Sequence, residues 1–302
     1  MSGFASNLVT KVASFGKQEA QLHLATKRDI SHILQLYYEE GWIDYSRDEL
    51  EYLFDTSPNC CFKLTLDGKL IGVNFATLAG NGICYPHSNL LASAYRDKVN
   101  YFNEAVKYNE YLKQLSTLDV LYAAKKVIRI YQSGGGFTPI GYYRRASIDV
   151  SAIDPAGNRA RPANEADYPA IYAFCKNIYQ SERENLIRYF VDRGIARAYV
   201  LPSNADGIAA FAMVRKLPKY HMIGPVLAND DEGAAQVISA AARGQPDASV
   251  VIEGAQEKLE RLLSKQFDYA WEDNVMLKMY RGDRSLLEDE NRIYSIFARY
   301  TS

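Results

Sequence analysis

The pattern of apolar and polar positions predicts alternating strands and helices in the first half of the chain. Residues 20–26 (AQLHLAT) alternate in polarity like a half-buried strand, and residues 29–40 have the spacing of an amphipathic helix. Ser46 and Glu49 have the spacing of a capping box, which predicts a second helix that begins after Ser46. One strand followed by two helices is therefore expected at the start of the fold.

A β-hairpin is the strongest local signal in the sequence. Two β-rich runs, CCFKLTL and KLIGVNFATL, are joined by Asp67-Gly68, a pair that favours a two-residue hairpin turn. This order predicts a mixed α/β (α+β) domain. The elements expected after the hairpin are a strand that ends at 89–93, a helix over 100–115, a strand over 118–124, a short helix over 125–133 and a strand over 142–150.

The second half of the chain repeats landmarks of the first half. TKRDI precedes the first helix and NEADY precedes a later one, while the hairpin recurs over 199–214. Two widely spaced landmarks recur at nearly the same separation, which predicts two copies of one fold. Pro, Gly and Asn cluster at the boundary between the copies. The expected division is an N-terminal tail (1–19), an N-terminal domain (20–153), a linker (154–162) and a C-terminal domain (163–302).

Composition narrows the classes of partner. The 302 residues include 35 basic and 36 acidic side chains, for a net charge of −1, so neither nucleic acid nor a membrane is an expected partner. No apolar run is long enough to span a bilayer, and no secretory signal is recognised, so we expect a cytoplasmic protein. The cysteines and histidines lack ligand spacing, so we expect reduced thiols and no metal site. The cysteines are Cys60, Cys61, Cys84 and Cys175.

The order of elements resembles that of the GCN5-related N-acetyltransferase (GNAT) superfamily, because the third strand leads through Tyr95-Arg96 into a helix. The segments AAFAMVRKLPKYHMIGPVLA, MYRGD and RIYSI resemble a bacterial subgroup with two tandem GNAT-like domains. Residues 223–226 (IGPV) are the most specific part of this resemblance, which covers 20–302. The resemblance implies a tandem GNAT acyl-CoA N-acyltransferase fold.

The resemblance also implies a site for acetyl-CoA or another acyl-CoA at the loop before the helix, where backbone N–H groups hold the pyrophosphate. Val99 and Tyr101 stand where the family has small residues, and their side chains would occupy space needed by phosphates. Arg96 and Lys98 still attract an anion. We expect weak or absent acetyl-CoA binding; alternatively, 97–102 only begins a helix. The implied coenzyme-binding residues are Leu90, Leu91, Arg96, Asp97, Lys98, Val99, Asn100 and Tyr101.

The corresponding segment of the second domain is less suited to a coenzyme. Residues 224–237 (GPVLANDDEGAAQV) place Asp230, Asp231 and Glu232 at a predicted helix start. Carboxylates stabilise the helix dipole there but repel a pyrophosphate. We therefore expect the second domain to act as a cover or as a wall of the substrate site.

Acetyl transfer to an amine requires a proton acceptor, oxyanion donors and an acid for the departing thiolate. The resemblance implies that Tyr131 is the acid; a shift of register would put Gln132 there, and Tyr131 packed on the core is a third reading. Glu39 and Glu40 are either candidate bases or a solvated helix end. The implied substrate residues are Tyr38, Trp42, Tyr45 and Tyr85, whose rings suit a cationic or aromatic ligand, although tyrosines are also ordinary core residues.

The leading functional hypothesis is an acyl-CoA-dependent N-acyltransferase that acts on the amine of a small molecule or peptide. The alternative is a catalytically degenerate GNAT-fold protein that binds a small ligand or a protein partner without acetyl-CoA. A third hypothesis, an aminoacyl-tRNA-dependent transferase, conflicts with the near-neutral charge. Fold alone does not choose among these hypotheses.

Overall fold

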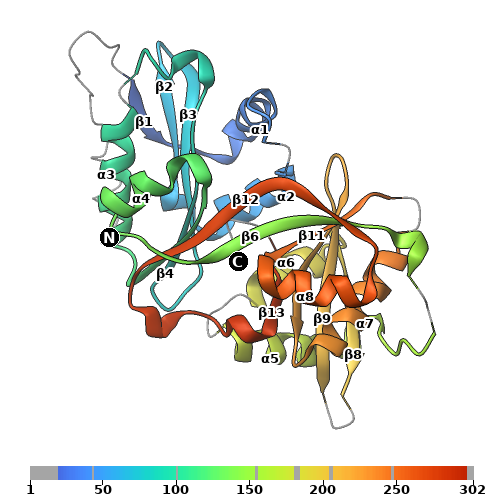
Figure 1. Ribbon diagram of the computed structural model, residues 1–302. Coiled ribbons are helices and arrows are strands. Elements are labelled where there is room, and N and C mark those ends of the chain that lie inside the picture. Colours follow the sequence, from blue (N-terminus) through green and yellow to red (C-terminus); the bar gives the residue numbers. More distant parts are fainter. Residues whose placement is uncertain are drawn as a thin grey trace. The chain divides into compact units, whose positions relative to one another are not determined.

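A computed structural model describes residues 20–42, 44–99, 101–153, 156–179, 184–203, 207–245 and 248–297. The chain divides into two compact units between Leu121 and Tyr122 (Figure 1). The predicted tail 1–19 lies outside the described residues. No helix of the described part of the chain is long and apolar enough to cross a membrane.

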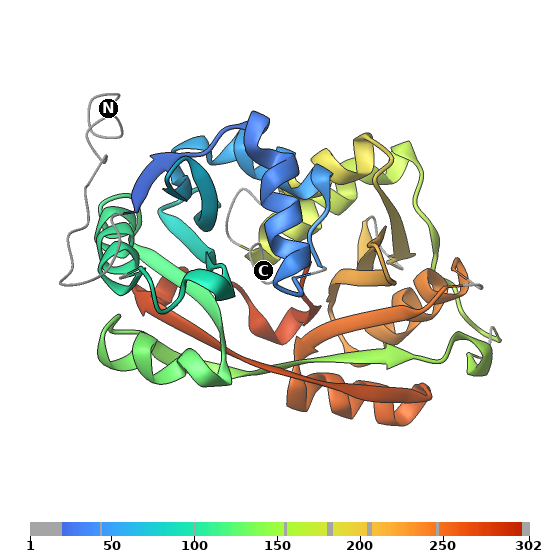
Figure 2. The ribbon, with the colours of Figure 1, turned by 90° about the horizontal axis from the view of Figure 1, so that it is seen from above.

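The N-terminal unit is a sheet with helices on both faces. Its sheet order is β1-β2-β3-β4-β5, in which neighbours are antiparallel except for the parallel pair β4 and β5. Helices α1 and α2 contact β3, whereas α3 packs on the other face (Figure 2). The elements are β1 (Gln21–Leu24), α1 (Ile30–Glu39), α2 (Arg47–Thr56), β2 (Cys61–Leu66), β3 (Lys69–Leu78), β4 (Ile83–Leu91), α3 (Tyr101–Lys113) and β5 (Leu118–Ala124), which ends beyond the division.

Local sequence rules explain how these elements begin and turn. The Ser46 hydroxyl accepts the N–H of Glu49 at 3.3 Å, and the Glu49 carboxylate accepts the N–H of Ser46 at 2.6 Å, which confirms the predicted capping box. Asp67 and Gly68 both have positive φ, at 49° and 77°, as a type I′ hairpin turn requires. The predicted hairpin is confirmed.

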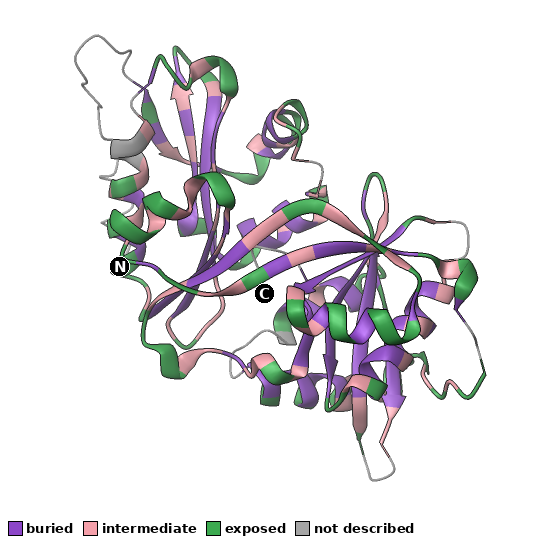
Figure 3. Ribbon diagram, viewed as in Figure 1, coloured by how far each residue is buried: buried purple, intermediate pink, exposed green. Residues whose placement is uncertain are grey.

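The core of the N-terminal unit lies between α3 and the sheet. Phe62 on β2 packs edge-on against Tyr108 and Tyr111 of α3, with ring centroids 5.6 and 5.7 Å apart. On the opposite face, Phe75 of β3 packs against Phe54 of α2 at 5.8 Å. Figure 3 shows that buried residues follow the strands, and this burial holds the end of β4 and the start of α3 in place.

The C-terminal unit repeats this architecture. Its sheet order is β12-β6-β11-β10-β9-β8-β7, and β13 pairs with β10 off this path. Helices α7 and α8 cover one face with a large apolar cluster. The elements are α4 (Ile128–Ser133), β6 (Thr138–Ile148), β7 (Arg161–Pro162), α5 (Tyr168–Tyr179), α6 (Glu184–Asp192), β8 (Ala196–Pro202), β9 (Ile208–Lys216), β10 (His221–Ala228), α7 (Asp231–Arg243), β11 (Val250–Ala255), α8 (Gln256–Gln266), β12 (Tyr269–Gly282) and β13 (Ile293–Ser295).

The two halves of the chain share one order of elements, so the predicted mixed α/β fold is confirmed. In each half a strand, a short 3₁₀ turn and two helices precede a meander of three strands. Thr26 and Asn164 cap the two 3₁₀ turns with matching capping boxes. Residues 122–153 group with the second compact unit, because β6 pairs with β11 and β12. The predicted domain limits, 20–153 and 163–302, stay a prediction.

Candidate functional site

The candidate coenzyme loop connects β4 to α3, and most of its N–H groups already have partners within the loop. Tyr95 donates to the carbonyl of Ala92 at 2.9 Å, and Arg96 donates to that of Ser93 at 3.3 Å. The N–H groups of Lys98 and Val99 both donate to the carbonyl of Tyr95, at 3.0 and 3.1 Å. A phosphate cradle needs N–H groups that point outward without partners. In this conformation the loop is a compact turn rather than a cradle.

A carboxylate of the protein itself binds two further groups of the loop that could hold an anion. Glu40, at the end of α1, accepts the N–H of Ser93 at 2.6 Å and the Arg96 guanidinium at 2.6 Å. The Glu40 side chain is 10% exposed, so this ion pair is partly shielded from water. Arg96 also donates to the carbonyl of Leu91 at 3.1 Å. Glu40 therefore binds the loop as an anionic ligand would.

The two residues that replace small residues in the loop have different positions. Val99 is 2% exposed and belongs to the core cluster that includes Leu91 and Tyr108, so its side chain fills core volume. The Tyr101 hydroxyl donates to the side-chain oxygen of Asn74 on β3. The interpretation that both side chains take phosphate space thus does not fit Val99, which points inward.

Some of the other predicted coenzyme-binding residues are buried on β4, and others are exposed in the loop. Leu90 and Leu91 are buried at the end of β4, whereas Asp97 and Lys98 are exposed. The Lys98 ammonium lies 5.4 Å from the centre of the Tyr95 ring. Asn100 lies outside the described residues. Whether any of these residues binds a coenzyme remains a prediction.

The strand that leads into the loop has an edge with little pairing. β4 and β5 pair in parallel only where Ile83 and Cys84 meet Leu118 and Asp119. The parallel ladder between β4 and β5 therefore covers only the first two residues of β4. Such an edge can pair with the amide groups of an extended ligand.

Three of the aromatic residues singled out in the sequence form one cluster with Tyr37. The Tyr37 ring lies 5.6 Å from Trp42 and 4.5 Å from Tyr45, while Trp42 and Tyr45 are stacked at 6.2 Å. Tyr38, which is 46% exposed, donates its hydroxyl to the carbonyl of Tyr45 at 3.4 Å. Tyr85 is fully buried on β4. The end of α1 and the turn after it therefore carry an aromatic cluster, in which Tyr37 and Tyr45 are buried and Tyr38 is exposed.

A chain of hydroxyl and imidazole groups continues from this cluster into β4. The Tyr45 and Ser88 hydroxyls lie 2.9 Å apart, and Ser88 Oγ lies 2.9 Å from His87 Nδ1. Burial lowers the pKa of His87 to about 3, so the imidazole is neutral at neutral pH and is a poor proton acceptor. Sequence reasoning missed Ser88, which no motif marked.

The predicted acid, Tyr131, packs against an aromatic ring, and the predicted base Glu39 lies at the surface. The Tyr131 ring on α4 packs edge-on against Phe137 at 5.8 Å, and Gln132 is exposed. Glu39 is exposed and accepts the side chain of Gln35 at 2.8 Å, as expected of a solvated helix end. The two roles proposed for Tyr131 and Gln132 remain predictions.

The C-terminal repeat has a counterpart of this site, and the chain itself fills it. β10 and β11 pair in parallel over His221–Ile223 and Val250–Ile252, and beyond these residues β13 pairs with β10. At the start of α7, Asp231 accepts the Tyr294 hydroxyl at 2.8 Å and pairs with Arg261 at 3.1 Å. The predicted cluster of acidic residues at this helix start is confirmed.

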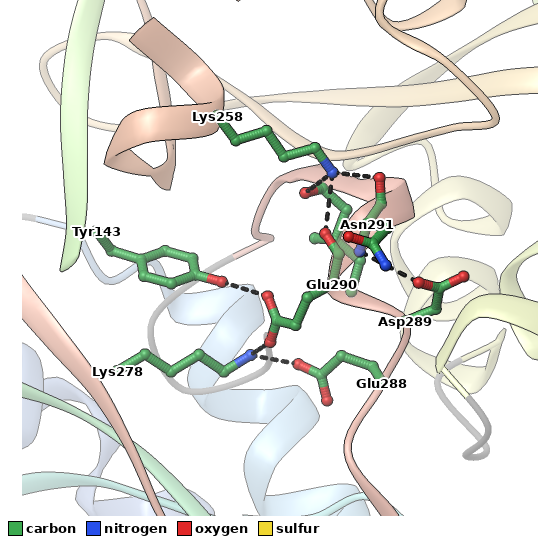
Figure 4. Close-up of polar contacts among 8 residues, drawn as sticks. Tyr143, Lys258, Lys278, Glu288, Asp289, Glu290 and Asn291 are labelled. Atoms are coloured by element: carbon green, nitrogen blue, oxygen red, sulfur yellow. Dashed lines mark hydrogen bonds and ion pairs between the residues drawn. The ribbon is translucent and has the colours of Figure 1, made fainter. Parts of the chain in front are cut away.

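A buried ionic cluster holds the segment that leads to β13 (Figure 4). Lys278, which is 1% exposed, donates to Glu288 at 2.6 Å and to Glu290, and Glu290 also accepts the Tyr143 hydroxyl at 2.7 Å. Burial alone would lower the pKa of Lys278, but Glu288 and Glu290 raise it well above its ordinary value. Sequence reasoning missed this cluster, because Lys278 lies 10 and 12 positions from Glu288 and Glu290, and Tyr143 lies 147 positions from Glu290.

Comparisons with known proteins agree with the sequence resemblance. Residues 173–295 match the family model described as an acetyltransferase (GNAT) domain. A search of curated proteins found no match. The structure is similar to that of a Pyrococcus horikoshii protein described provisionally as an acetyltransferase, with a TM-score of 0.77 and 15% identity over 96% of this chain and 98% of that one.

Two further solved structures are similar over most of their length. A tandem GNAT protein from the clavulanic acid biosynthesis pathway has a TM-score of 0.62 and 13% identity over 87% of this chain and 98% of that one. A GCN5-related N-acetyltransferase from Sphaerobacter thermophilus has a TM-score of 0.60 and 11% identity over 87% and 95%. The predicted resemblance is therefore confirmed: the chain has the tandem GNAT fold, and residues 173–295 match the GNAT acetyltransferase model.

Proposed function

We propose that the protein is an acyl-CoA-dependent N-acyltransferase that acylates the amine of a small molecule or peptide, with the coenzyme in the N-terminal repeat. The observation that carries this proposal is the short parallel pairing of β4 with β5 at Ile83 and Cys84, after which β4 leads directly to Arg96 and Lys98. An acyl-CoA has amide groups that can pair with a strand edge and a pyrophosphate that basic side chains attract.

The loop limits how tightly such a ligand binds. The N–H groups of Tyr95, Arg96, Lys98 and Val99 are engaged within the loop, so the pyrophosphate would contact the side chains of Arg96 and Lys98. Arg96 would have to exchange Glu40 for the ligand, and the displaced carboxylate would stay nearby. Each lost charge-assisted hydrogen bond removes roughly 1.5–3 kcal/mol, so we expect a dissociation constant between the micromolar and millimolar ranges.

The chemistry requires one bond to form and one to break. The amine nitrogen attacks the thioester carbonyl, the C–N bond forms and the C–S bond breaks, and the departing thiolate takes a proton. We propose that the Tyr131 hydroxyl donates this proton to the thiolate. The amine gives up a proton to solvent or to a base that His87 does not supply, since burial lowers its pKa to about 3. The rings of Tyr38 and Trp42 suit a cationic or aromatic acceptor.

Calorimetry with CoA and acetyl-CoA tests coenzyme binding directly. The Arg96→Ala variant should bind acetyl-CoA about tenfold more weakly, corresponding to the loss of about 1.4 kcal/mol. Arg47→Ala is the matched control, because Arg47 is an exposed arginine on α2. Absence of binding at millimolar acetyl-CoA, together with absence of thiol release in the presence of amines, would refute the enzyme.

Turnover tests the assignment of the acid. Tyr131→Phe removes only a hydroxyl, so thiol release should fall on the order of a hundredfold while acetyl-CoA affinity is unchanged. If Gln132→Ala lowers turnover and Tyr131→Phe does not, the register that places Tyr131 at the thiolate is wrong.

The loop itself favours a second candidate, a GNAT-fold protein that binds an amine ligand without coenzyme. Glu40 already supplies the anion for Ser93 and Arg96. Tyramine is a suitable probe, because it is an aromatic cation. In a Trp271→Phe background only Trp42 reports by fluorescence, so quenching by tyramine without any acetyl-CoA binding would favour this candidate over the enzyme.

A further inference from the structure

The C-terminal end of the described chain forms a strand inside the sheet of its own repeat. β13 pairs with β10 at Val226↔Ser295 and Leu227↔Ile293, and the N–H of Ile296 donates to the carbonyl of Glu253 on β11 at 2.9 Å. Every residue from 293 to 297 is at most 4% exposed. The segment 292–297 thus lies against both β10 and β11, beyond the point where these strands stop pairing with each other.

Both flanking strands carry a glycine where the segment passes. A methyl group at Gly224 of β10 would collide with the carbonyl oxygen of Ile296, and one at Gly254 of β11 would collide with that of Tyr294. The Ser295 hydroxyl donates to the carbonyl of Ile223 at 2.8 Å. Backbone contacts this close require residues without a Cβ, so the two strands are adapted to an extended chain between them.

The same segment also reaches the helix start that corresponds to the coenzyme loop. The Tyr294 hydroxyl donates to Asp231 at 2.8 Å, and the Arg292 guanidinium donates to Asn229 at 2.7 Å. A single stretch of chain therefore contacts the strand edges and the α7 start together. An extended coenzyme would need both of these regions.

Two lysines anchor this segment. The Lys258 ammonium on α8 donates to the backbone carbonyls of Glu290, Asn291 and Ile293, at 2.9, 2.5 and 3.0 Å (Figure 4). Burial lowers the pKa of Lys258 to about 8, whereas three acceptors favour the ammonium, which alone has three N–H donors. Lys278 fixes Glu288 and Glu290 just before the segment.

We propose that residues 292–297 are the resident ligand of the C-terminal repeat, bound by strand addition in its β10–β11 cleft, so that this repeat accepts no acyl-CoA. The chain then holds at most one coenzyme. This inference does not depend on whether the N-terminal repeat binds one.

Hydrogen exchange on the full chain tests whether the segment is resident. The amide of Ile296 should exchange as slowly as those of β10, and saturating acetyl-CoA should not change its rate. Lys258→Ala should accelerate exchange over 290–297 at least tenfold, whereas Lys265→Ala, an exposed lysine on the same helix, should not. Exchange of Ile296 at the rate of an exposed loop, or faster exchange with acetyl-CoA, would overturn the proposal.

Binding stoichiometry supplies a second, independent readout. Native mass spectrometry at millimolar CoA should detect at most one specifically bound CoA per chain. Two bound CoA molecules would contradict a filled second cleft. If no CoA binds, the proposed acyltransferase fails, while slow exchange at Ile296 would still support the resident strand.

Discussion

The two repeats share an order of elements but differ in what lies beyond the paired part of their parallel strands. In the N-terminal unit, the parallel ladder of β4 with β5 covers only Ile83 and Cys84. In the C-terminal repeat, β13 takes the corresponding place beside β10. The same fold therefore has a short two-residue parallel ladder in one copy and an added strand beside the parallel pair in the other.

The starts of α3 and α7 also differ in the charged residues that they carry. Arg96 and Lys98 lie before α3, and Glu40 reaches them from α1. Asp230 and Asp231 begin α7, and Asp231 binds Tyr294 and Arg261. The carboxylate of the first loop comes from a neighbouring helix and a ligand could displace it, whereas the second helix start carries its own acid. This contrast favours the N-terminal repeat as the place for an anionic ligand.

Among the features that distinguish the two repeats, the contacts that anchor β13 should have the largest effect on stability when they are removed. Lys278→Met leaves Glu288 and Glu290 without their counter-ion, and breaking a buried ion pair costs roughly 3–5 kcal/mol of unfolding free energy. Urea denaturation measures this loss. Lys265→Met, at an exposed position, is the control, and Lys278→Met with Glu288→Gln should recover part of the stability.

The pH dependence of that variant has a definite sign. Without Lys278, burial raises the pKa of Glu288 in the folded state above its unfolded value of about 4.3. The folded state then binds the proton more tightly, so the stability deficit should shrink as pH falls towards about 4. In the natural protein, the raised pKa of Lys278 contributes stability below about 10.5 that is lost as pH rises through the folded value. A deficit that is independent of pH would show that Glu288 stays ionised or finds another partner.

The interior of the N-terminal loop gives the next largest expected effect. Val99 is buried with Leu91 and Leu112, so Val99→Ala should lower the unfolding free energy by roughly 1.5–3 kcal/mol without improving acetyl-CoA binding. Val106→Ala, on the helix α3 that follows the loop, is the control, because Val106 is 41% exposed. Tighter acetyl-CoA binding in Val99→Ala would show that the valine side chain obstructs the coenzyme after all.

Local rules were enough to predict much of the fold. The Ser46 capping box and the Asp67-Gly68 turn depend on residues within a few positions of each other, and both formed as expected. The repeat was visible because its landmarks recur in order. The strand β13 was not predictable in the same way, since three residues carry little pattern and its partner β10 is distant in sequence.

The candidate site was harder to predict, because its contacts join residues far apart in the chain. The sequence allowed Glu40 to be a base or a solvated helix end. Its two partners, Ser93 and Arg96, are 53 and 56 positions away, and nothing local indicates that they meet. Val99 was interpreted from the loop pattern alone, and the fold turned its side chain into the core.

The closed edge of the C-terminal repeat can be disturbed at a single glycine. Gly254→Ala places a methyl group against the carbonyl oxygen of Tyr294, and overpacking of this kind costs roughly 1–3 kcal/mol. Gly141→Ala is the matched control, because a Cβ on that β6 glycine meets open space. Thermal unfolding and exchange at Ile296 measure the effect. Equal stability of the two variants would mean that the segment tolerates displacement.

The smallest expected effect concerns the carboxylate in the N-terminal loop. Glu40→Gln keeps an acceptor for Ser93 but removes the charge that competes with a pyrophosphate for Arg96. The partly shielded pair contributes about 1 kcal/mol, so acetyl-CoA should bind about fivefold more tightly to the variant in calorimetry. Glu39→Gln, one residue earlier and exposed, should leave the affinity unchanged. Weaker binding in Glu40→Gln would mean that Glu40 orders the loop for the coenzyme instead of competing with it, and the end of β4 would then belong to a preformed site.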